Sequence, residues 1–297
     1  MTRARTGADP EFLTVRELAE LLRIKERKVY DLAATGSVPC SRATGKLLFP
    51  AAEVRAWIAG ASTGGTPDIG PRPPAILLGS HDPLLDWAIR ESRCGLATFF
   101  DGSHDGLARF RAGEGVATGL HVHDAASGDW NLPVVAESCG DRNAALISFA
   151  TRRRGIVVRT GNGTIKGIAD LAGHRVTPRQ PESGTETLFH HLLARHGVSA
   201  GEITFGDVAR TETDAVQSVA RGTADAAFGL ECVARDFGLD FLPLVNERFD
   251  LLVDRAAWFD PPLQALERFC RAPAFAKRAE MTGGYDLGGH GEVRWNA

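Results

Sequence analysis

Hydroxyl side chains recur where an apolar strand-like segment gives way to a helix-like one. The hydroxyl residues, together with the glycine between the last two, are Ser80, Ser103, Ser183, Gly184 and Thr185. The free N–H groups and the positive dipole end of a helix N-terminus favour anions, and a hydroxyl adds a directional donor. Convergence of these turns predicts a binding site for a small oxyanion, although serine is also a common helix cap.

Ionisable side chains flank these turns. Arg179 would pair with an oxyanion, and His81 and His121 would do so when protonated. Glu231 begins a further helix at the expected rim, where a carboxylate repels an anion unless it turns away or is protonated. An organic or partly cationic ligand therefore stays open, as does a structural role for the two histidines.

Catalytic and metal-binding motifs give little support for an enzyme. The sequence has no GxSxG, P-loop or HExxH motif. Ser80, His81 and Asp82 are contiguous, so their side chains do not readily form a hydrolytic triad. The five cysteines are scattered and form no CxxC, which argues against a disulfide scaffold or a zinc site. We expect no catalytic residue, no cofactor and no direct metal ligand.

Basic side chains concentrate near the N-terminus. They are Lys25, Arg27 and Lys28 at the start of an expected helix, and Arg42 and Lys46 on an expected hairpin. A helix fits the major groove of DNA, and such charges would face phosphates. A helical dimerisation module with a solvated basic face is the alternative.

The elements around these charges follow a winged helix-turn-helix pattern. Thr14 and Glu17 have capping-box spacing at the start of a helix. A second helix over residues 25–34 is expected to direct Tyr30 into the core, and a hairpin over 37–49 precedes a third helix.

The segment FLTVRELAELLRIKERKVYDLAATGSVPCSRATGKLLFPAAEVRAWI, within residues 12–59, resembles the excisionase-like, MerR-type DNA-binding module. The resemblance implies binding to promoter DNA. Because one winged module covers little DNA, a homodimer or higher homo-oligomer is expected.

A Gly- and Pro-rich stretch separates this module from a larger body. We expect a DNA-binding domain over 1–59, a linker over 60–74 and a ligand-sensing domain over 75–297. The net charge is −3, so the chain as a whole has no positive field. The body alternates strand-like and helix-like segments, which predicts an α/β fold with a parallel sheet.

Several strands of this body are expected to be short. The apolar segments 144–149 and 155–159 predict two strands, as do 241–244 and 249–253. The mainly polar residues at 150–154 and 245–248 predict a break between the two strands of each pair.

The body resembles a cytoplasmic type II periplasmic-binding-protein-like domain. The resemblance rests on GSHDPLLD (79–86), ATGLHVHD (117–124), RQPESGTETLFHHLLARHG (179–197), GTADAAFGLECVAR (222–235) and FLPLVNERFDLLV (241–253). It implies two lobes, about 75–150 with 250–297 and about 155–245, and a ligand in the cleft between them. It places hinges near Ile147–Val158 and Asn246–Leu252. Molybdate or tungstate is the effector that the resemblance suggests.

These features together predict a one-component transcription regulator whose partners are promoter DNA and a small oxyanion. The N-terminal residues lack the apolar region of a secretory signal, and no apolar run is long enough to span a membrane. We expect a cytoplasmic protein with no membrane partner. A molybdenum-cofactor-related enzyme and a cytoplasmic oxyanion-binding protein remain alternatives.

Overall fold

The computed structural model describes residues 11–22, 24–42, 45–60 and 72–297. Contacts divide the chain into two units, Met1–Pro71 and Arg72–Ala297. The linker expected at 60–74 lies mostly outside the described residues.

The N-terminal unit is a small helical module. Helices α1 (Val15–Leu22), α2 (Glu26–Ala34) and α3 (Ala51–Gly60) accompany the short strands β1 (Phe12–Leu13) and β2 (Phe49–Pro50), which pair antiparallel.

Local sequence signals explain how this unit is built. The Thr14 amide donates to Glu17 Oε2 at 2.8 Å, and the Glu17 amide donates to Thr14 Oγ1 at 3.3 Å, so the predicted capping box starts α1. Side chains from all three helices and from β2 are fully buried and form one core: Leu18, Val29, Phe49 and Val54.

The larger unit is built on a ten-stranded mixed sheet, which confirms the α/β class. Its main path runs β4-β3-β5-β10-β6-β9-β7-β8, and β11 and β12 pair with β6. The strands are β3 (Ile76–Gly79), β4 (Ala97–Phe100), β5 (Ala117–Leu120), β6 (Ala144–Val158), β7 (Arg175–Thr177), β8 (Thr204–Phe205), β9 (Ala226–Leu230), β10 (Asp240–Asp254), β11 (Tyr285–Asp286) and β12 (Val293–Asn296). The expected parallel pairing holds within each lobe, but β6 and β10 pair antiparallel with their neighbours, so the prediction of a wholly parallel sheet is wrong.

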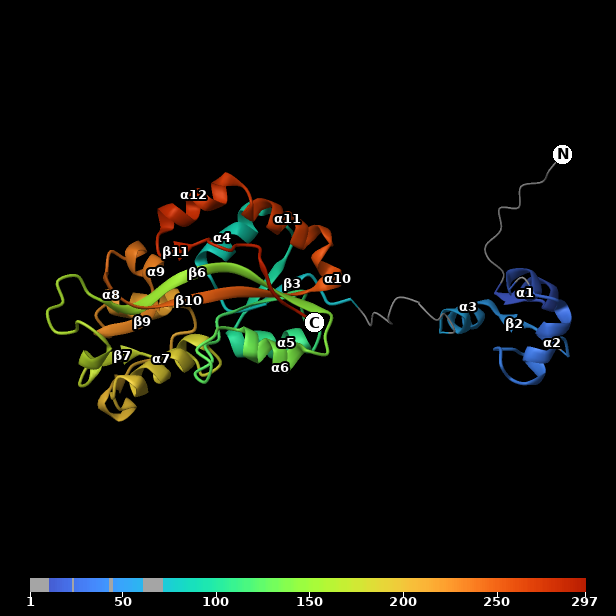
Figure 1. The fold of residues 1–297 in the computed structure, drawn as a ribbon, viewed down its shortest axis with the longest axis horizontal. Coiled ribbons are helices and arrows are strands. Elements are labelled where there is room, and N and C mark those ends of the chain that lie inside the picture. Colours follow the sequence, from blue (N-terminus) through green and yellow to red (C-terminus); the bar gives the residue numbers. More distant parts are fainter. Residues whose placement is uncertain (1–10, 23, 43–44, 61–71) are drawn as a thin grey trace. The chain divides into compact units, whose positions relative to one another are not determined.

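Helices cover both faces of this sheet (Figure 1). They are α4 (Pro83–Ser92), α5 (Ser103–Arg111), α6 (Leu132–Cys139), α7 (Gly184–Arg195), α8 (Glu212–Ala220), α9 (Glu231–Asp236), α10 (Arg255–Trp258), α11 (Pro261–Cys270) and α12 (Pro273–Thr282). Two 3-10 helices, η1 (Ile168–Leu171) and η2 (Ala200–Glu202), complete the unit.

Two lobes share the sheet. Lobe I comprises β3–β5 with α4–α6 and α10–α12, and lobe II comprises β7–β9 with α7–α9. In lobe I, Leu77 packs into the core that contains Leu84 and Phe275, while the next residue, Leu78, packs into the core that contains Leu107 and Phe110. A strand with both faces buried needs this continuous apolar sequence.

Strands β6 and β10 run through both lobes, as Figure 1 shows. Each is 15 residues long, and they pair antiparallel along almost their whole length. The interruptions expected at 150–154 and 245–248 are therefore wrong, apart from register shifts at Pro243/Val245 and Phe249/Asp250. Within the polar middle of these strands, Arg152, Arg154 and Glu247 are buried because their charges are paired.

Candidate functional site

The predicted turns converge because their strands are parallel. β3, β4 and β5 run in the same direction, so the residues that follow them meet at one edge of the sheet. Ser80 follows β3, Ser103 begins α5 after β4, and His121 follows β5. Gly184 begins α7 in lobe II.

The structure brings four of the predicted residues into contact. Ser80 Oγ lies 2.8 Å from Ser103 Oγ, and the His121 amide donates to Ser103 Oγ at 3.1 Å. Gly184 approaches from lobe II so closely that a Cβ there would lie 2.7 Å from the His121 carbonyl oxygen and 3.2 Å from Ser103 Oγ. We call Ser80, Ser103, His121 and Gly184 the interlobe site.

Contacts around this site hold the lobes closed. The His104 amide donates to the Glu182 carbonyl oxygen at 3.3 Å, and Arg210 Nη1 lies 3.2 Å from Asp101 Oδ1. Ser80, Ser103 and His121 are at most 5% exposed. A ligand would therefore enter only when the lobes separate.

Other predicted ligand residues have partners within lobe II. Arg179 donates to Glu212 Oε1 at 2.8 Å and to the carbonyl oxygens of Ala209 and Arg210. The Thr185 hydroxyl donates to the same Glu212 oxygen at 3.0 Å. In this conformation these two side chains organise the start of α8 and α7 rather than the interlobe site.

Ser183 also serves the helix that follows it, because its hydroxyl accepts the Thr185 amide and caps α7. Glu231 begins α9 and pairs with Arg153 at 2.6 Å and Arg235 at 3.5 Å. These arginines neutralise the Glu231 carboxylate, so the repulsion of an anion that was expected at the rim is reduced.

His81 packs its ring edge against Phe100, with ring centroids 5.6 Å apart. Its Nδ1 is buried without a hydrogen-bond partner among the described residues, as are Arg152 Nε and Gln180 Oε1. Buried polar groups are rarely left unpaired, and exceptions often mark functional positions.

An ion network on the two crossing strands was missed by the sequence reasoning. It alternates in charge from lobe I to lobe II, and we call it the hinge ion network: Asp82, Arg152, Glu247, Arg154, Glu212 and Arg179. Every member is at most 8% exposed, and three guanidinium groups match three carboxylates.

Short contacts link the members of this network. Arg152 donates to Asp82 Oδ2 at 2.9 Å and also binds Glu247. Arg154 donates to Glu247 Oε2 at 2.6 Å and to Glu212 Oε1 at 2.9 Å. Buried charges are tolerated when they are paired and hydrogen-bonded in this way.

The signal in the sequence was the run Arg152–Arg153–Arg154 between two apolar segments. Alternation along a strand places Arg152 and Arg154 on one face, where their side chains are at most 1% exposed, and Arg153 on the other, where it is 52% exposed. The partner Glu247 lies on β10, far along the chain, and no local pattern connects the two.

Neighbouring charges set the protonation of this network. Burial alone would raise the pKa of Glu247, but Arg152 and Arg154 outweigh it and hold that pKa well below the usual range. Burial is likewise outweighed at Glu212, whose pKa is lowered by its arginine partners. His121 Nδ1 lies 3.2 Å from Glu247 Oε2, yet burial lowers the pKa of His121 and favours its neutral form.

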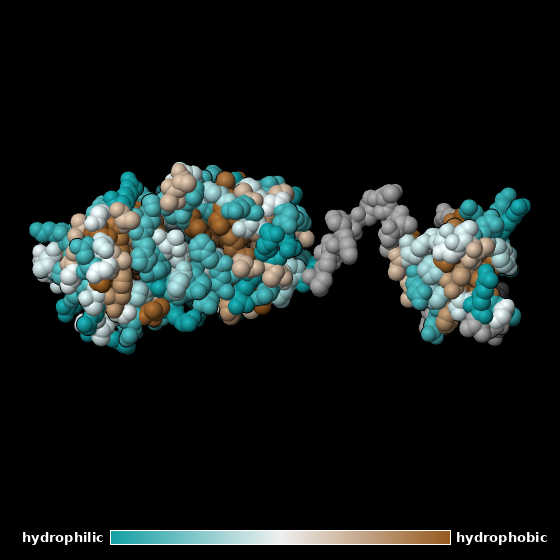
Figure 2. Space-filling view, turned by 90° about the horizontal axis from the view of Figure 1, so that it is seen from below, coloured by the Kyte–Doolittle hydropathy of each residue, from teal (hydrophilic) through white to brown (hydrophobic). Residues whose placement is uncertain are grey.

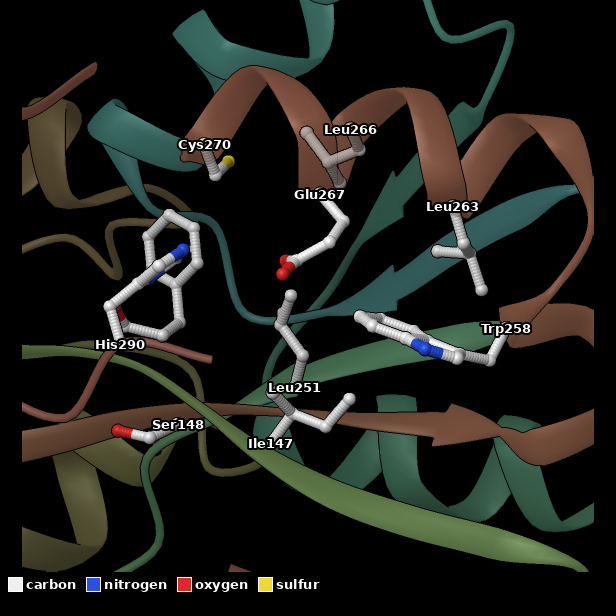
Figure 3. Close-up of a pocket in the computed structure, with 10 residues that line it drawn as sticks. Ile147, Ser148, Leu251, Trp258, Leu263, Leu266, Glu267, Cys270 and His290 are labelled. Carbon is white, nitrogen blue, oxygen red and sulfur yellow. The ribbon is translucent and has the colours of Figure 1, made fainter. Parts of the chain in front are cut away.

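A small cavity lies elsewhere in lobe I, beneath α11 (Figure 3). Its volume is about 20 Å³, and Figure 3 shows the Glu267 carboxylate pointing from α11 towards Leu251. His290 Nδ1 lies 2.7 Å from the Phe149 carbonyl oxygen and Nε2 has no partner among the described residues. The cavity has room for about one water, which is too little for an effector.

Apolar side chains on the surface are dispersed. The face in Figure 2 is mainly hydrophilic, with apolar residues in small separate patches. Phe259 and Met281, which are 77% and 68% exposed, belong to different segments. Such scattered residues are ordinary, so the interlobe site remains the better candidate.

The N-terminal unit carries the predicted basic side chains on its surface. Lys25 is the N-cap of α2, and Arg27 and Lys28 are exposed on its first turn. Arg42 and Lys46 are exposed and lie between residues 41 and 48, which form an isolated antiparallel bridge; residues 43–44 of the expected hairpin lie outside the described residues.

Tyr30 is 54% exposed on α2, so the expectation that it packs inward is wrong. The helix instead buries Val29 and Ala33. The face opposite this buried pair is open to a partner.

Within the residues described, no helix is long and apolar enough to cross a membrane. The same part of the chain contains no group of three or more side chains arranged to hold a metal ion.

Comparisons with known proteins agree with this architecture. A helix-turn-helix domain matches residues 12–62, and a PBP superfamily domain matches residues 87–271. The uncharacterized protein YvgK of Bacillus subtilis is 26% identical over 262 residues, which cover 81% of this chain and 84% of that protein. An uncharacterized Clostridium pasteurianum protein, from the 5′ region of a 2Fe-2S ferredoxin gene, is 34% identical over 77 residues, covering 26% of this chain and 68% of the relative.

Among solved structures, the fold resembles a protein from Clostridium perfringens that was crystallised with phosphate and assigned as a phosphate ABC transporter substrate-binding protein. The TM-score is 0.53 at 11% identity, covering 70% of this chain and 96% of the other. The likeness shows the fold alone.

Proposed function

Because the chain belongs to the PBP superfamily and carries a helix-turn-helix domain, we propose that it is a one-component transcription regulator that binds a small oxyanion between its lobes. One observation carries the proposal: turns from both lobes meet at the interlobe site in a chain that also presents an exposed basic helix. Ligand binding and DNA binding then belong to one molecule.

The donors at the interlobe site suit an oxyanion. The hydroxyls of Ser80 and Ser103 lie beside the N-termini of α5 and α7. First-turn amides have no acceptor within their own helix, and here the amides of His104 and Thr185 donate to Glu182 and Ser183 in the closed form. The arginines of the hinge ion network are already matched by carboxylates. Neutral hydroxyl and amide donors would therefore hold the anion.

Molybdate and tungstate are the effectors that we put first, on the resemblance of the body to domains that sense them. The phosphate in the Clostridium perfringens structure is bound by that protein and makes phosphate a second oxyanion to test. An effector acts only through its different affinity for open and closed lobes. Its binding would change how two copies of the DNA-binding unit are presented to a promoter.

A thermal-shift screen of the full chain with molybdate, tungstate, sulfate, phosphate and small carboxylates tests the ligand class. A tight ligand raises the melting temperature by mass action. Ser80→Ala should weaken binding of that ligand at least tenfold, since a hydrogen bond to a charged group is worth about 1.5–3 kcal/mol. Ser199→Ala, at an exposed cap in lobe II, is the matched control.

DNA binding is tested by fluorescence anisotropy with the region upstream of the gene, at several salt concentrations. Phosphate contacts predict affinity that falls steeply with salt. Replacement of Arg27 and Lys28 by alanine should remove it, whereas Arg16→Ala on α1, which pairs with Glu20, should not. If no anion stabilises the protein and no salt-dependent DNA binding is seen, the proposal is wrong; anion binding alone would favour an oxyanion-binding protein.

A further inference from the structure

Histidines gather where the two lobes touch. Of the nine histidines in the chain, four lie at contacts between the lobes: His104 and His121 contact lobe II through backbone atoms, and His123 and His191 contact each other through their rings. Histidine is the side chain whose charge changes most readily between about pH 5 and 8. The contact that closes the lobes is therefore rich in groups that acid can charge.

His123 and His191 face each other directly across the two lobes. Their ring centroids are 5.1 Å apart and the rings are tilted by 41°. His123 follows β5 in lobe I and packs its other side on Trp130, at 5.0 Å, whereas His191 lies on α7 in lobe II. Separation of the lobes would part these two rings.

The charged groups around this pair do not favour a second positive charge. Arg195, on α7, adds a cation near His123. Asp124 is the nearby carboxylate, and it accepts the Ser127 amide at 3.0 Å and the Ala126 amide at 3.4 Å within its own turn. Protonation of His123 would thus place a positive charge against the His191 ring and beside an arginine.

We propose that acidification from about pH 8 to about pH 5.5 opens the lobes, and that protonation of His123, where its ring faces His191 of the other lobe, drives the opening. If the proposed function holds, the same acidification releases the effector, because closed lobes are needed to surround it.

The direction follows from proton linkage. Burial, together with the charges of His191 and Arg195, lowers the pKa of His123 in the closed form. Burial also lowers the pKa of His104 and of His121. In the open form these rings are in water and bind protons more readily. The population of the open form therefore rises as pH falls through about 6.5. Each histidine whose pKa differs by one unit between the forms changes the open-to-closed ratio by up to about tenfold.

Pulsed electron paramagnetic resonance on the full chain measures the opening without ligand or DNA. Spin labels are attached at Ala112→Cys in lobe I and Ala200→Cys in lobe II, both exposed positions. Cys40→Ser removes the exposed native cysteine, and the other four cysteines are buried. Distances are recorded at about pH 8 and about pH 5.5.

The distance should lengthen at the lower pH. The pair variant His123→Gln with His191→Gln should lengthen much less than the parent at the lower pH. His196→Gln, at the exposed C-cap of α7, is the control and should lengthen like the parent. A parent whose distance is the same at both pH values, or a pair variant that lengthens as much as the parent, would overturn the inference. Either outcome leaves the tests of anion and DNA binding unaffected.

Discussion

Replacement of Gly184 by alanine should hold the lobes apart. The added Cβ would lie 2.7 Å from the His121 carbonyl oxygen, whereas ordinary contacts begin near 3.4 Å. The obstructing atom belongs to the backbone, so it cannot swing aside. The facing segments must separate by about 0.7 Å, and overpacking of this kind typically costs about 1–3 kcal/mol.

That cost falls on the closed form only. Gly184 is the first residue of α7, where alanine is compatible with a helix, so each lobe should keep its fold. A penalty of about 1–3 kcal/mol lowers the closed-to-open ratio, and with it the affinity for the effector, by about 5- to 150-fold. Gly163→Ala is the matched control, because a Cβ there meets no atom within 4 Å.

Two measurements check this prediction. Isothermal titration calorimetry compares both variants with the parent, using the anion that stabilises the parent most in the thermal-shift screen. Pulsed electron paramagnetic resonance between the labels at positions 112 and 200 reports the separation of the lobes. If Gly184→Ala bound within twofold of the parent and showed the parent's distance, the assignment of the closed contact would be incorrect.

Three further predictions follow from the charged residues. Glu247→Gln should lower the free energy of unfolding by about 3–5 kcal/mol and Tm by about 6–20 °C, because it leaves a buried positive charge unmatched. Addition of Arg152→Gln should recover part of this lost stability. An unchanged Tm of Glu247→Gln in calorimetry would contradict the prediction. The lowered pKa values of Glu247 and Glu212 predict that their contribution to stability is fully present above the ordinary glutamate pKa and is lost as pH falls below about 4.3. Denaturant midpoints that stay constant as the pH falls below this value would contradict the prediction. Alanine at Arg27 and Lys28 should each reduce the slope of log affinity against log salt by about one, and an unaltered slope would place the DNA contact elsewhere.

Local patterns in the sequence were sufficient for much of the fold. The spacing of Thr14 and Glu17 predicted the cap that starts α1. Apolar segments followed by small residues predicted the parallel strands of lobe I and hence the meeting of Ser80 and Ser103. These features depend on neighbours along the chain, or on the general rule that parallel strands end at one edge.

Features that depend on distant partners were not predictable. Arg152 and Arg154 indicated a break between two strands, and only Glu247, on another strand, makes them compatible with one buried strand. Arg179 was expected at the anion, but Glu212 holds it at the start of α8. A single sequence does not reveal which opposite charges will meet.

The hinge ion network limits how this protein can be adapted to other effectors. Because its members are buried and matched, a change of one charge requires a compensating change on another element. Ser80, Ser103 and Gly184 are uncharged and have no such obligation to partners of opposite sign, unlike Asp82, which lies two residues after Ser80 and pairs with Arg152. Engineering, like divergence among homologues, should therefore change ligand choice through substitutions in the turns that carry Ser80, Ser103 and Gly184 and leave the hinge ion network unchanged.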